Sequence, residues 1–174
     1  KLLLKYKSGS DILVIDRYNI PTKGTSLKNS GVLHAGLYYP PESEKSKLCI
    51  NGHEELKQLC IDNNLPFLKC GKIIFPSSSN FDNERIENLY KNAKSCNRKV
   101  SIIDYDFAKN IQPGIIKRDC YLWSPSTCVF SPDAILDFFY KVLLSSGVKF
   151  IKEKVISIDR NKNKILTSEN KSIK

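Results

Sequence analysis

The chain has 174 residues, a formal net charge of +10 and a hydrophobic fraction of 41%. This length allows one sizeable core or two half-domains, and this hydrophobic fraction excludes a wholly disordered chain. The positive charge alone would fit nucleic acid, a membrane surface or acidic substrates. Because the lysines are scattered among asparagines, without a dense basic block or an interleaved aromatic stripe, we expect no nucleic-acid interface.

The chain begins at Lys1 and contains no methionine, so we expect it to be a piece of a longer protein. No apolar run reaches the roughly 18 residues of a membrane span. The six cysteines lie far apart, and none forms the C-x-x-C pair that zinc and redox sites favour. They predict reduced thiols, several of them in the core, and no metal site.

The first predicted elements are a helix end and a short strand. Residues 2–4, followed by lysines and Gly9, are typical of the last turns of a helix. Residues 11–16 enclose a continuous apolar run, which is typical of a buried parallel strand. A helix end, a tight link and a buried strand together predict the second half of a βαβ unit.

Downstream, apolar periodicity and turn residues predict further helices and strands. In chain order these are a helix over 43–63, a strand over 72–75, a helix carrying residues 86–96, strands near 100–103 and 120–123, a helix from 131 that ends at Gly147, a strand over 148–151, and a hairpin of 155–159 with 164–167. In the first helix we expect one buried face, with His53 on the surface. That face carries Leu48, Leu56, Leu59 and Cys60.

Asp16 is the first candidate for a binding role. In a dinucleotide-binding βαβ unit, an acid at the end of the second strand accepts hydrogen bonds from the ribose hydroxyls of adenosine. An acid at a strand end is also common without any ligand. The alternative for Asp16 is therefore a solvated strand end.

The loop from Ser26 to Tyr39 is the second candidate. Small residues let backbone N–H groups approach a planar or phosphate group closely, and the loop supplies Ser26, Asn29, Ser30 and Gly31. His34, Tyr38 and Tyr39 can act on protons. Taken alone, a single histidine is more often structural, and two tyrosines before two prolines are more often packing residues.

Three pieces of sequence together resemble one family. They are the run 29–39, Lys47-Leu48-Cys49 followed by Gly52, and the run 70–74. This combination is similar to the L-2-hydroxyglutarate dehydrogenases, which belong to the FAD-dependent, amino-acid-oxidase-like superfamily. The resemblance implies an α/β fold, with an incomplete Rossmann-like FAD-binding domain and an inserted α+β substrate domain.

The resemblance also implies a division of the chain. Residues 1–66 and 128–174 would be parts of the FAD-binding domain, and residues 67–127 part of the substrate domain. The FAD contacts would come from Asp16, Ser26, Asn29, Ser30 and Gly31, and from Val155 in the strand whose backbone meets the adenine.

The activity implied by the resemblance is oxidation of L-2-hydroxyglutarate to 2-oxoglutarate, by hydride transfer from C2 of the acid to the flavin. His34 would be the base that takes the hydroxyl proton, and Lys72, Tyr38 and Tyr39 would bind the substrate. The electrons pass to an acceptor that the sequence does not identify. The family leads us to expect a mitochondrial or cytoplasmic protein.

Three alternatives stay open at this point. A related FAD-dependent enzyme could act on glycerol 3-phosphate or an amino acid. The positive charge alone would support a non-catalytic domain that binds nucleic acid. A degenerate, flavin-free scaffold is favoured by Leu27, which stands where the resembled family has a glycine, and by the segment 128–132, which departs from the family's pattern.

Overall fold

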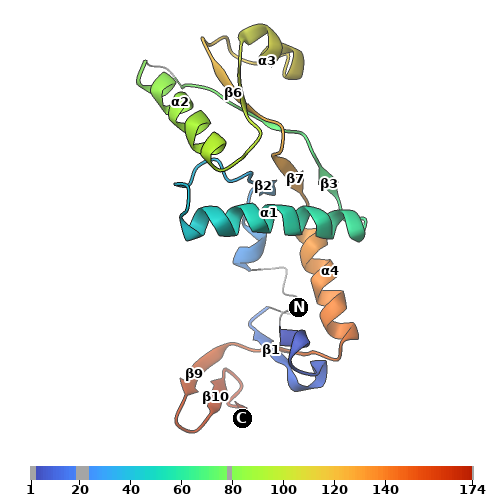
Figure 1. Ribbon diagram of the computed structural model, residues 1–174. Coiled ribbons are helices and arrows are strands. Elements are labelled where there is room, and N and C mark those ends of the chain that lie inside the picture. The colour runs from blue at the N-terminus through green and yellow to red at the C-terminus, as the bar shows by residue number, and fades with distance from the viewer. Residues whose placement is uncertain (1–2, 19–23, 78–79, 174) are drawn as a thin grey trace. The chain divides into compact units, whose positions relative to one another are not determined.

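The computed structural model describes residues 3–18, 24–77 and 80–173 (Figure 1). Leu2, part of the expected helix end, lies outside the described residues. The chain forms two compact units, which are described separately below: unit 1 contains residues 1–29 and 132–174, and unit 2 contains residues 30–131. The predicted functional domains have other boundaries, and they stay a prediction.

Unit 1 has a parallel strand pair at its centre. Strand β1 (Leu13–Asp16) pairs in parallel with β8 (Lys149–Lys152), so that Asp16 lies opposite Lys152. The predicted strands at 11–16 and 148–151 are therefore confirmed to within two residues. The remaining elements of this unit are η1 (Leu3–Lys5), η2 (Gly9–Asp11), η4 (Thr25–Leu27), α4 (Pro132–Ser145), β9 (Val155–Asp159), β10 (Lys164–Thr167) and β11 (Ser172–Ile173).

Helix α4 begins and ends where the sequence predicts. Pro132 occupies the first helical position, and Asp133 lies in the first turn. At the other end Gly147 has φ +84°, and the N–H groups of Gly147 and Val148 donate to the carbonyls of Leu144 and Leu143. This is a Schellman cap, which needs a left-handed residue at the glycine position.

The predicted hairpin in unit 1 is also present. Strands β9 and β10 pair antiparallel, and β11 adds a third strand that the sequence did not predict. Glu153 lies just before β9 and is buried, with Lys171 Nζ 2.6 Å from its carboxylate. This ion pair lowers the pKa of Glu153 and, with Glu169, raises that of Lys171 to about 12.

Unit 2 contains two small antiparallel sheets. Strand β7 (Cys128–Phe130) lies between β2 (Val32–Leu33) and β3 (Phe67–Leu68). Strand β6 (Tyr121–Ser124) lies between β4 (Lys72–Ile74) and β5 (Ser101–Ile103). The helices of this unit are α1 (Glu44–Asp62), α2 (Asn80–Ser95) and α3 (Tyr105–Ile111) (Figure 1).

The core of unit 2 joins helix α2, strand β6 and the loop after β2. Its buried members are Ala35, Leu37, Ile86, Ala93, Val100 and Leu122. Ala35 and Leu37 are buried in this core, whereas His34 and Tyr38 on either side of them are exposed. The buried residues thus fix the direction of the exposed ones.

Helix α1 is confirmed in extent, and its predicted buried face is confirmed in part: Cys60 is buried, and Leu56 and Leu59 are half-buried. Ser43 caps its N-terminus by accepting the N–H of Ser46. Its buried residues are Ser46, His53 and Cys60, which lie seven residues, or about two helical turns, apart. The predictions for Leu48 and His53 were wrong: Leu48 is 70% exposed and His53 only 2%, because the buried face is chosen by what packs against it rather than by the leucines.

Among the helices in the described ranges, none is both long and apolar enough to span a bilayer.

Substituting glycine by alanine should have opposite effects at Gly71 and Gly52. At Gly71, where φ is +71°, an added Cβ would lie 1.9 Å from the ring of Trp123. Gly71→Ala should lower the free energy of unfolding by at least about 2 kcal/mol, from backbone strain and overpacking. Gly52→Ala, on an exposed helical turn with open space around it, should raise it by about 0.5–1 kcal/mol. Urea unfolding measures the free energy of unfolding of both variants. Equal changes in the two variants would contradict this prediction.

Candidate active site

In unit 1, Asp16 lies at the carboxyl end of the parallel strand β1, where nucleotide ligands of α/β folds bind. Its side chain is exposed, and Oδ1 accepts the N–H of Tyr18 at 2.8 Å. Its backbone carbonyl accepts the N–H of Glu153 at 2.9 Å, which ties the strand end to the segment before β9. The carboxylate therefore has acceptor capacity left for a ligand.

Ser26, Asn29 and Val155 are the other predicted cofactor residues of unit 1, and each takes part in contacts with the backbone. Ser26 is exposed in η4, and its carbonyl accepts the side-chain amide of Asn29 at 2.6 Å. Val155 is half-buried at the start of β9, opposite Thr167 at a register irregularity. These contacts keep the loop and the strand in place, with the Ser26 hydroxyl at the surface.

Ser30 and Gly31 open unit 2. The hydroxyl of Ser30 accepts the N–H of Val32 at 3.4 Å. Gly31 is buried with φ +65°, and its carbonyl accepts the N–H of Phe130 at 2.8 Å. Gly31 therefore packs closely against the end of β7, and its predicted contact with the cofactor stays a prediction.

Three predicted residues of unit 2 come together at the surface. Lys72 in β4 donates from Nζ to the hydroxyl of Tyr38 at 2.6 Å and lies 4.8 Å from the centre of its ring. The ring of His34 meets that of Tyr38 edge-on, with 6.2 Å between centroids. The structure thus joins the predicted base with two of the predicted substrate-binding residues; we name this group the His34 cluster.

The electrostatics of the His34 cluster favour a neutral imidazole. Partial burial lowers the pKa of His34, and the positive charge of Lys72 lowers it further. A histidine with a pKa below 6.5 is unprotonated at neutral pH, so its free ring nitrogen can accept a proton. The same lysine can also pair with a carboxylate. One cation can therefore both lower the pKa of His34 and bind an anionic group.

Tyr39 contacts residues outside the His34 cluster. Its ring is 4.5 Å from Lys45 Nζ, and its carbonyl accepts the side-chain amide of Asn92 at 2.7 Å. The same amide nitrogen donates to the carbonyl of Leu37 at 2.8 Å. Asn92, which the sequence analysis did not single out, therefore fixes the backbone on both sides of Tyr38.

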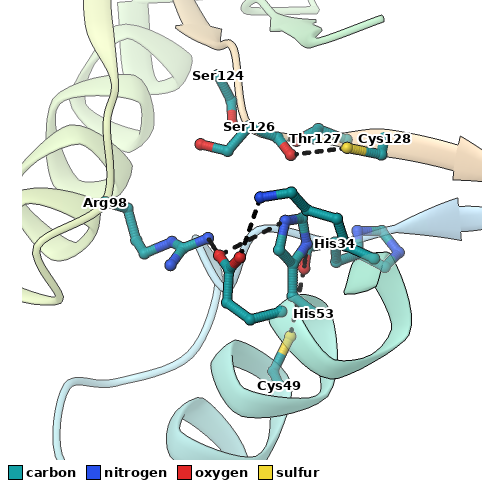
Figure 2. A network of polar contacts seen from close by, with 10 residues as sticks. His34, Cys49, His53, Arg98, Ser124, Ser126, Thr127 and Cys128 are labelled. Carbon is teal, nitrogen blue, oxygen red and sulfur yellow. Dashed lines mark hydrogen bonds and ion pairs between the residues drawn. The ribbon is translucent and has the colours of Figure 1, made fainter. Parts of the chain in front are cut away.

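Two side chains of α1 contact the backbone carbonyl of His34 (Figure 2). His53 of α1 lies with Nδ1 3.1 Å from the carbonyl oxygen of His34, and Cys49 donates to the same oxygen from 3.8 Å. Since a carbonyl only accepts, Nδ1 of His53 carries the proton. Sequence reasoning missed His53; its spacing of seven residues from Ser46 and Cys60 was the available signal.

His53 is also part of a charged group. Its Nε2 lies 4.0 Å from Glu54, which also pairs with Lys57 at 3.2 Å and with Arg98 at 3.6 Å (Figure 2). Burial lowers the pKa of His53; the charge of Glu54 opposes this shift, and that of Arg98 adds to it. The imidazole is therefore neutral near pH 7, as a buried histidine should be.

A cavity of about 630 Å³ lies between β4, β6 and the segment after α3. Lys72 lines it, together with Gly71, Trp123 and isoleucines of the 111–116 segment. A volume of this size accommodates a small organic acid. Within the part of the chain that the structure describes, no three His, Cys, Asp or Glu side chains are grouped to hold a metal ion.

Removing the charge of Lys72 should change the titration of His34. In Lys72→Gln the cation is lost while the burial stays, so the pKa of His34 should rise towards 6.5. Proton NMR of the imidazole signals measures this directly, because the chain has only two histidines. Lys91→Gln, an exposed change on α2 with the same loss of charge, is the control. A pKa of His34 that stays constant in Lys72→Gln would show that the lysine does not act on it.

The buried neutral His53 should make stability depend on pH. Because its pKa is lower in the folded chain than in the unfolded chain, the unfolded chain binds the proton more readily. This contribution to the free energy of unfolding is complete above pH 6.5 and is lost as the pH falls below it. Urea unfolding between pH 7.5 and 5.5 should show the loss, and His53→Asn, which keeps a donor near Nδ1, should reduce it. An unchanged pH dependence in His53→Asn would exclude His53 as its source.

Known proteins share both the sequence pattern and the fold. The family model "FAD dependent oxidoreductase" (DAO) matches residues 2–173. Over 86 residues the chain is 38% identical to the mitochondrial L-2-hydroxyglutarate dehydrogenase of Nematostella vectensis, covering 49% of the chain and 19% of that protein. Over 156 residues it is 25% identical to the L-2-hydroxyglutarate dehydrogenase of Escherichia coli (strain K12), covering 89% of the chain and 36% of that protein.

The chain therefore spans about a fifth to about a third of these two relatives. Among solved structures, glycine oxidase from Geobacillus kaustophilus matches with a TM-score of 0.80 and 12% identity, over 91% of this chain and 45% of that one. L-alpha-glycerophosphate oxidase from Mycoplasma pneumoniae with FAD bound matches with a TM-score of 0.75 and 16% identity, over 89% and 42%. These similarities confirm the predicted α/β fold with part of a Rossmann-like domain. With a family model that matches nearly every residue, the chain belongs to the family of FAD dependent oxidoreductases.

Proposed function

We propose that this chain is part of an enzyme that oxidises L-2-hydroxyglutarate to 2-oxoglutarate, with FAD as its cofactor. The observation that carries the proposal is the His34 cluster, in which a neutral imidazole lies beside a lysine and a tyrosine hydroxyl. The relatives at 38% and 25% identity, both named L-2-hydroxyglutarate dehydrogenase, support this substrate. The Nematostella vectensis relative is named as mitochondrial, and for this chain we propose a mitochondrial or cytoplasmic location.

The described residues fit FAD. Asp16 offers an exposed carboxylate at the carboxyl end of a parallel strand, which suits the ribose hydroxyls. Ser26, Asn29, Ser30 and Gly31 would line the cofactor through hydroxyl, amide and backbone groups, and Val155 would meet the adenine through its backbone. When bound, FAD supplies the acceptor for the hydride from C2 of the substrate.

The side chains of the His34 cluster would then bind the substrate and accept its proton. Lys72 and the hydroxyl of Tyr38 would hold one substrate carboxylate by charge-assisted hydrogen bonds. His34 would take the proton of the substrate hydroxyl on its free ring nitrogen as the hydride leaves C2. Because Lys72 keeps the pKa of His34 low, the imidazole is ready to accept that proton at neutral pH. The predicted substrate-binding role of Tyr39 stays a prediction.

Closely related reactions are the second candidate. The solved structures with this fold include a glycine oxidase and an L-alpha-glycerophosphate oxidase. A lysine at the site suits any anionic substrate, including an amino acid or glycerol 3-phosphate. Anaerobic bleaching of the flavin absorbance by each of these compounds, compared with L-2-hydroxyglutarate, separates the candidates.

His34→Ala tests the catalytic role. In a protein that carries this chain together with the remaining segments of its relatives, kcat should fall about 10²–10⁴-fold, the usual contribution of a general base. Lys72→Gln should mainly raise KM for the dicarboxylate, with Lys91→Gln as the control. Turnover of His34→Ala within about threefold of wild type would remove His34 from the chemistry, given that expected contribution.

A further inference from the structure

A second cavity of unit 2, of about 290 Å³, lies between α1, the turn after α2 and the start of β7. It does not include the side chains of the His34 cluster. His53, whose role is to hold the backbone of His34, forms part of its wall (Figure 2). We name this space the His53 cavity.

The His53 cavity is strongly positive. Its wall contains the cationic side chains of Lys57, Lys69, Arg98 and Lys99, and one carboxylate, that of Glu54. Like charges close together repel, and this repulsion is strong where solvent is partly excluded. The arrangement is therefore favourable only if something negative shares the space.

Glu54 does not neutralise these charges alone. It already pairs with Lys57 and with Arg98, at 3.2 and 3.6 Å, and is itself 54% exposed in its side chain. Lys69 and Lys99 are exposed at the rim. A single carboxylate shared between two cations leaves net positive charge on the wall.

Arg98 provides the second, independent observation. Its side chain is only 11% exposed, and its Nε is buried without a hydrogen-bond partner among the described residues. Buried N–H donors are normally satisfied, because leaving one unpaired costs free energy. Arg98 therefore brings to the cavity wall a largely buried guanidinium whose hydrogen bonding is incomplete.

We propose that the His53 cavity binds a small oxyanion, a phosphate or a carboxylate. The acceptor oxygens would pair with the guanidinium of Arg98 and with the ammonium groups of Lys69 and Lys99. Arginine and lysine are the residues that bind such groups, arginine with directed donors and lysine as a point charge. The site does not depend on the chemistry proposed for His34.

The test is a titration of the chain with inorganic phosphate, followed by NMR and compared with sodium chloride at equal ionic strength. We expect a saturable shift of the His53 imidazole signal, while that of His34 moves less. A parallel titration with succinate separates phosphate from carboxylate as the preferred oxyanion. No saturable shift with either compound, or the same shift with chloride, would overturn the proposal.

Variants locate the site. Arg98→Gln should weaken the apparent affinity at least tenfold. Because Arg98 is largely buried, Lys69→Gln combined with Lys99→Gln, two exposed changes, tests the same cavity without disturbing the core, and should also weaken binding. Lys91→Gln, exposed on α2 outside the cavity, should leave it unchanged. Equal weakening by Lys91→Gln would mean a general charge effect and would contradict a defined site.

Discussion

The anchoring of the loop after β2 is the constraint on which the candidate site depends. Ala35 and Leu37 are buried in the core of unit 2, and the side-chain amide of Asn92 holds the carbonyls of Leu37 and Tyr39. From the other side, His53 holds the carbonyl of His34. A loop fixed at so many backbone atoms has little freedom, and functional side chains on rigid supports keep the geometry that chemistry requires.

The same arrangement fixes the position of Lys72 relative to His34. Lys72 reaches the loop from β4, a strand held by its pairing with β6, so its charge stays beside Tyr38 and His34. A fixed cation lowers the pKa of its histidine neighbour in the resting site. Under the proposed function, an anionic substrate would neutralise that cation, and the histidine would become a better base at the moment a proton must be taken. Binding and proton transfer would thereby be linked through electrostatics.

Sequence patterns predicted the long elements and missed those that depend on distant partners. The helix of α4, with proline at its start and glycine at its end, and the β9–β10 hairpin follow local rules and were found. The two- and three-residue strands β2, β3 and β7 have no periodicity of their own and exist because they pair with each other. Helix α3, capped by Asp104, is too short for an apolar pattern.

The candidate site likewise contains residues that the sequence predicted and residues that it did not. The resemblance of the loop to a known family selected His34, Tyr38 and Lys72, and the structure brings these three together. Nothing local marked Asn92, and only the seven-residue spacing from Ser46 and Cys60 marked His53. The hydrogen bonds of both residues reach backbone atoms far away in the chain. Of the residues predicted for the buried face of α1, Leu48 is exposed, because the surface that packs against an amphipathic helix decides which of its residues become buried.

Unit 2 begins and finishes on neighbouring strands, because β2 pairs directly with β7. A module whose entry and exit lie side by side can be placed between two segments of a host without stretching either one. The pairing of Val32 with Val129 therefore holds the two ends of unit 2 together.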